Sequence, residues 1–91
     1  MWHFEITEGV LRDVPSREAF ADYAAFEAVA TVVFLNRGRV FIRAALRTDG
    51  RGLRTADFRD IARKLRDEYG VDLIEYDRKG VVRSWPTARA W

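Results

Sequence analysis

Apolar and polar residues alternate at the start of the chain, where Trp2, Phe4 and Ile6 are separated by more polar neighbours. A period of two is typical of a half-buried strand, so the sequence predicts a first strand that turns at Gly9. Residues 10–14 are then expected to pair back as a short second strand, which a proline ends.

A helix is expected next. Ser16 has the side chain of an N-cap, Glu18 suits the positive end of a helix dipole, and the helix is predicted to reach about Phe26. Residues 29–35 are mostly β-branched and are apolar on both faces. This run predicts a central strand that is covered on both sides.

A turn at residues 36–38 is predicted to lead into the following strand, because asparagine and glycine tolerate a positive φ. Alternation along that strand predicts one face made of Val40, Ile42, Ala44 and Leu46. The opposite face is expected to carry Arg39, Phe41, Arg43, Ala45 and Arg47.

Helical spacing of apolar residues is clearest in the second half of the chain. Thr55 is predicted to cap this helix, Gly70 to end it, and Asp60 to form an ion pair with Lys64 one turn later. The stripe that faces the core is expected to be Phe58, Ile61, Ala62, Leu65 and Tyr69.

A closing hairpin is predicted from residues 71–77 and 81–85. The element order is therefore β(β)αββαββ, and the predicted fold class is α+β: a single small domain over residues 1–91, with a mostly antiparallel sheet and two helices on one face. An open sheet leaves edges, so a homo-oligomer formed through a sheet edge is one expectation.

Composition limits the chemistry that the side chains can perform. Of the 91 residues 48% are hydrophobic, which favours a folded chain, and none is cysteine. There is one histidine, His3, and no recognisable nucleophile or metal-ligand pattern, so the residues predict no catalytic site, no metal and no cofactor. With no long apolar run and no signal-peptide pattern, the expected location is the cytoplasm, with no membrane partner.

Charge is distributed unevenly along the chain. Residues 37–66 contain ten Arg or Lys and three Asp, for a net charge of +7, whereas residues 1–34 contain two basic and six acidic residues, for a net charge of −4. A positive field of this kind attracts phosphates and acidic protein surfaces. The predicted partner-binding residues are Arg39, Phe41, Arg43, Arg47, Arg51, Arg54, Arg59 and Arg63.

A glycine loop lies between the third predicted strand and the second helix. Arg47, Gly50 and Gly52 have the spacing R-x-x-G-x-G, and the amides of such a loop can bind phosphate beside a helix start. Over about residues 40–77 the chain resembles the acetyl-coenzyme A-binding core of the GNAT acetyltransferase family, whose motif is likewise followed by a helix, a glycine and a strand. The cofactor-binding residues that this resemblance implies are Arg47, Gly50, Arg51, Gly52 and Leu53.

Three functions follow as hypotheses. The first is a small non-enzymatic protein that uses its arginines to engage an acidic protein partner, a type of domain that is frequent among accessory proteins of bacteriophages and mobile elements. The second is a nucleic-acid-binding module, in which Arg39, Arg43 and Arg47 contact phosphates and Phe41 stacks on a base. The third is a truncated or degenerate GNAT-like domain, which would be an acyltransferase if it retained activity.

Overall fold

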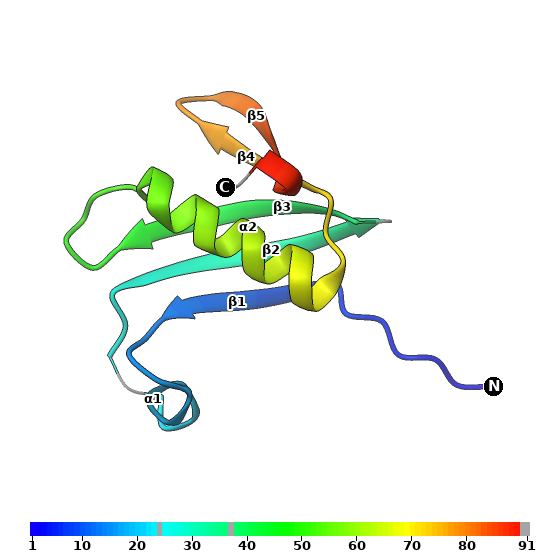
Figure 1. Ribbon diagram of the computed structural model, residues 1–91, viewed down its shortest axis with the longest axis horizontal. Coiled ribbons are helices and arrows are strands. Elements are labelled where there is room, and N and C mark those ends of the chain that lie inside the picture. The colour runs from blue at the N-terminus through cyan, green and yellow to red at the C-terminus, as the bar shows by residue number, and fades with distance from the viewer. Residues whose placement is uncertain (24, 37, 90–91) are drawn as a thin grey trace.

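The fold is built on a five-stranded sheet in the order β1-β2-β3-β4-β5 (Figure 1). The computed structural model describes residues 1–23, 25–36 and 38–89. The strands are β1 (Glu8–Asp13), β2 (Ala28–Asn36), β3 (Arg39–Arg47), β4 (Leu73–Arg78) and β5 (Val81–Pro86). The helices are α1 (Arg17–Ala21), α2 (Thr55–Tyr69) and the short 3₁₀ helix η1 (Thr87–Arg89). All neighbouring strands are antiparallel except β3 and β4, which α2 connects in parallel. The predicted α+β class and mostly antiparallel sheet are therefore confirmed.

The buried core lies between α2 and the face of the sheet that α2 crosses (Figure 1). Its residues are Ala30, Val32, Val40, Ile42, Ala62, Leu65, Val71 and Ile74. Along α2 the predicted stripe is confirmed in its centre, where Ala62 and Leu65 are buried, whereas Tyr69 at its end is 53% exposed. The predicted hairpin of β4 and β5 is also present, and Pro86 is its last strand residue.

Both ends of α2 are set by local hydrogen bonds. The N-cap is Arg54 rather than the predicted Thr55, because the Asp57 carboxylate accepts a hydrogen bond from the Arg54 amide at 2.8 Å. At the other end Gly70 takes a φ of 67°, as the predicted C-cap requires. Lys64 forms an ion pair with Glu68, at 2.7 Å, and not with Asp60 as predicted.

The predicted strand over residues 2–7 is wrong, since the sheet begins at Glu8 and Gly9 lies inside β1 instead of turning it. The register explains why. Glu8 lies opposite Val33, and β2 ends three residues after Val33, at Asn36. The residues before position 5 therefore extend past the end of β2 and have no residue of that strand opposite them. Trp2 and Phe4 are 100% and 94% exposed there.

Helix α1 begins as predicted, with the Ala19 amide donating to the Ser16 hydroxyl at 3.0 Å. It ends at Ala21 rather than at Phe26, because Tyr23 takes a φ of 55°, outside the right-handed helical region. The helix lies beside β1 and buries none of its residues (Figure 1). The prediction that both helices cover the sheet is therefore correct for α2 alone.

A bulge in β3 changes which side chains face α2. Thr31 lies opposite Arg43 and Val29 opposite Leu46, so two steps along β2 match three along β3, and the extra residue Ala44 has a φ of 52°. The predicted alternation is therefore wrong beyond Arg43. Leu46 turns away from the core and is 47% exposed.

The face of the sheet opposite α2 is called the open face here. Val29, Thr31 and Val33 of β2 lie on it and are only partly buried, so the prediction that this strand is covered on both sides is wrong. Among the helices in the described part of the chain, none has the length and apolar character needed to cross a membrane.

Candidate functional site

Three of the predicted partner-binding residues, Arg39, Phe41 and Arg43, lie together on the open face. Both arginines already have acidic partners in the chain, since Arg39 pairs with Glu75 and Arg43 with Glu8 across the strands. Exposed pairs of this kind contribute little to stability, about 0–1 kcal/mol each. They do neutralise the positive charge that was expected to attract an anionic partner.

Arg47 lies on the other face of the sheet because of the bulge. Its side chain is only 12% exposed, and its Nη1 lies 3.2 Å from a carboxylate oxygen of Asp57 in α2. The predicted strand surface with three arginines, on which the nucleic-acid hypothesis depended, is therefore wrong as a geometry. Arg47 instead forms an ion pair that links the end of β3 to the start of α2.

Asp57 is the centre of this internal cluster. Burial alone would raise the pKa of its carboxyl, but the hydrogen bonds from Arg54 and the charges of Arg54 and Arg47 outweigh burial and hold the pKa below its usual value. The same contacts raise the pKa of Arg54. Asp57 is therefore an ionised structural group at neutral pH.

In the glycine loop, hydrogen bonds within the chain engage several of the groups that a phosphate would need. The Arg51 amide donates to the Asp49 carboxylate at 2.9 Å, and the Gly50 amide donates to the Arg47 carbonyl at 3.0 Å. Asp57 also places a negative charge beside the α2 N-terminus. Gly52 has open space around it, and Leu53 packs against the core.

The remaining predicted partner-binding residues belong to the helical layer. Arg54 caps α2, Arg59 and Arg63 are exposed one turn apart on it, and Arg51 is exposed in the loop before it. The eight predicted residues thus divide between the open face and the opposite side of the molecule. They do not form one continuous basic surface.

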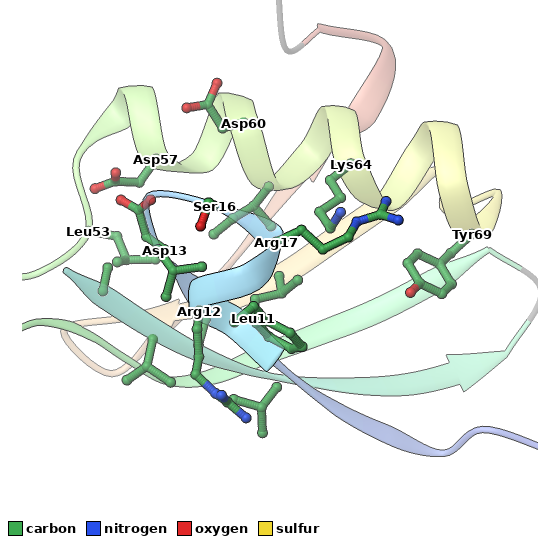
Figure 2. Close-up of a pocket in the computed structure, with 17 residues that line it drawn as sticks. Leu11, Arg12, Asp13, Ser16, Arg17, Leu53, Asp57, Asp60, Lys64 and Tyr69 are labelled. Carbon is green, nitrogen blue, oxygen red and sulfur yellow. The ribbon is translucent and has the colours of Figure 1, made fainter. Parts of the chain in front are cut away.

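A cleft of about 560 Å³ lies between α1, α2 and the helix-facing side of β1 and β2 (Figure 2). The small residues Ala28 and Ala30 form its floor, and the apolar side chains of Leu11, Leu53 and Ile61 line it. Its volume is in the usual range for a ligand site, about 300–1,000 Å³. The hydrophobic pattern of the sequence did not predict this cleft, although the two alanines at core positions of β2 are a signal that space is left above the sheet.

Charges on the cleft rim are separated along its length. Asp13, Asp57 and Asp60 gather at the end nearest Leu53, while Lys64 and the guanidinium of Arg17 lie toward Tyr69 (Figure 2). A second, smaller hollow of about 110 Å³ continues the cleft along β1, past Tyr69 to Ile6. The cleft therefore forms part of a groove along β1 that is acidic at one end and basic toward the other.

Strand β1 also offers its outer edge beside this groove, because it is the first strand of the sheet. The carbonyls of Thr7 and Asp13 accept hydrogen bonds from the β2 side, at 2.9 Å and 2.8 Å. Backbone groups alternate in direction along a strand, so those of Glu8, Val10 and Arg12 point to the outer edge. An added strand can pair with them.

Within residues 1–23, 25–36 and 38–89, no three His, Cys, Asp or Glu side chains are placed to hold a metal ion. Comparison of the chain with protein-family models, curated proteins and solved structures finds no match.

We expect acetyl-coenzyme A to bind weakly, because its pyrophosphate would have to displace Asp49 from the Arg51 amide and approach the ionised Asp57. Calorimetry measures this directly, and Asp49→Ala should strengthen whatever binding occurs. Micromolar binding by the native chain that Gly50→Glu abolishes would contradict this prediction, and it would support the GNAT-like hypothesis instead.

Proposed function

We propose that the chain is a non-enzymatic protein-binding domain, and that its groove binds an extended, largely apolar segment of a protein. The observation that carries this proposal is the position of the cleft directly beside the outer edge of β1. An extended peptide bound there gains main-chain hydrogen bonds from the strand and contacts for alternate side chains from the cleft. Both kinds of contact are needed for a peptide site that is specific as well as stable.

The charges of the groove favour a protein segment over a nucleic acid. Its rim has side chains of both signs, namely Asp13, Asp57 and Asp60 against Arg17 and Lys64 (Figure 2). A polyanion would meet the three carboxylates, whereas a peptide with an apolar face and mixed polar residues meets charges of both signs.

Selection from a random peptide library tests this function. The target is the chain with Trp2→Ser and Phe4→Ser, so that its own exposed aromatic residues do not interfere. We expect the selected peptides to have apolar residues at alternate positions. Their affinity should fall at least about tenfold with Ile61→Arg in the cleft and stay unchanged with Arg59→Glu on the far side of α2.

Circular dichroism must show that the Ile61→Arg variant is folded, and Leu11→Arg on the opposite wall is the second variant. If the selected peptides bind Ile61→Arg and Leu11→Arg as tightly as they bind the chain without these substitutions, the proposal is wrong. Acidic peptides whose binding is lost only with Arg59→Glu would favour the arginine-dependent acidic partner that the sequence predicts.

A further inference from the structure

We propose that the groove is filled by residues 1–6 of a second copy of this chain, so that two copies exchange these segments. This inference depends on the proposed function and names its partner. The chain presents both an exposed apolar segment and a groove with apolar walls. Trp2 and Phe4 are 100% and 94% exposed, and the segment leads away from its own sheet (Figure 1).

The segment has the pattern that a strand added to β1 needs. In an extended chain alternate side chains share one side, so Trp2, Phe4 and Ile6 can all face the cleft when the segment pairs with the outer edge of β1. Thr7 is the first residue of its own chain that is bonded to β2, through the Phe34 amide. The residues before it are therefore free to rotate into a neighbouring molecule.

Size also fits this occupant. The floor residues Ala28 and Ala30 leave room above the sheet, and a cleft of about 560 Å³ holds two large aromatic side chains. Aromatic residues bury about 150–250 Å² each, so two exchanged segments and the walls that they cover bury on the order of 1,600 Å². This is the area of a standard stable interface, about 1,200–2,000 Å².

Sedimentation of the purified chain over a range of concentrations is the first test. We expect a dimer whose dissociation constant rises at least about 100-fold with Trp2→Ser and Phe4→Ser together, since buried aromatic anchors dominate such interfaces. Both residues are exposed in the single chain, so this variant keeps its fold. A native chain that stays monomeric, or a dimer that the double variant leaves unchanged, overturns the inference.

Cross-linking between introduced cysteines shows where the segment lies. Because the sequence has no cysteine of its own, only the introduced thiols can react. A Phe4→Cys chain mixed with a Lys64→Cys chain should give a heterodimer with a short bis-maleimide, whereas a mixture with the neighbouring Arg63→Cys should not. Cross-linking only within one chain that carries both Phe4→Cys and Lys64→Cys would mean that the segment folds into its own groove, which refutes the exchange. Peptide binding by a monomeric chain would refute the exchange but leave the proposed function intact.

Discussion

Replacing Asp57 by alanine is expected to lower the free energy of unfolding by about 2–3 kcal/mol, because two contacts are lost together. The Arg54 amide at the start of α2 loses its acceptor, and such caps contribute about 1 kcal/mol. Arg47, with only 12% of its side chain exposed, loses its main carboxylate partner. Chemical denaturation of the purified chain measures the change.

Asp60→Ala is the matched control, since it removes an exposed carboxylate one turn later on the same helix and should change stability by less than about 0.5 kcal/mol. Equal effects of the two variants would mean that the cluster around Asp57 does not stabilise the fold.

The stabilisation from Asp57 should also depend on pH. Its pKa in the folded chain lies below the usual value of about 3.9, so the stabilising charge is fully present above that pH and is lost as the pH falls through the folded pKa. The difference in stability between the native chain and Asp57→Asn is therefore expected to be largest at neutral pH. It should shrink in acid.

Leu65→Ala is expected to cost about 2–5 kcal/mol of stability, because this side chain is 2% exposed and lies at the centre of the core between α2 and the sheet. The same substitution at Leu46 is the control. The bulge at Ala44 places Leu46 on the open face, where it is 47% exposed, so its loss should cost less than about 1 kcal/mol. Thermal and denaturant unfolding measure both.

A large loss from Leu46→Ala would contradict the bulge and would favour the regular alternation that the sequence predicts for this strand. The comparison therefore tests the position of Arg47 as well, because the two side chains change faces together.

Elements with a strong local pattern were predictable from the sequence. The apolar spacing of α2 and the glycine that ends it are local signals, and so are the turn residues between β4 and β5. Each of these signals acts within a few residues, where backbone geometry and side-chain chemistry decide the outcome. The predicted α+β class depended on these elements, and it is confirmed.

The candidate site was less predictable, because its parts come from different elements. Alternation correctly placed Arg39 and Arg43 on one face, but the bulge at Ala44 has no glycine or asparagine to mark it and moved Arg47 to the other face. A single inserted residue reverses every side chain that follows it, so a strand face is secure only when the pairing is known.

At the start of the chain, too, the local sequence pattern and the pairing of strands gave different answers. The sequence by itself determined that Trp2, Phe4 and Ile6 alternate as in a strand, and this is a property of neighbouring residues. Only the tertiary structure decided that β2 ends before it can pair with Trp2 and Phe4, and that a cleft lies between α1, α2 and the sheet. Pairing and clefts depend on where other segments end in space, and the hydrophobic pattern of one segment does not contain that information.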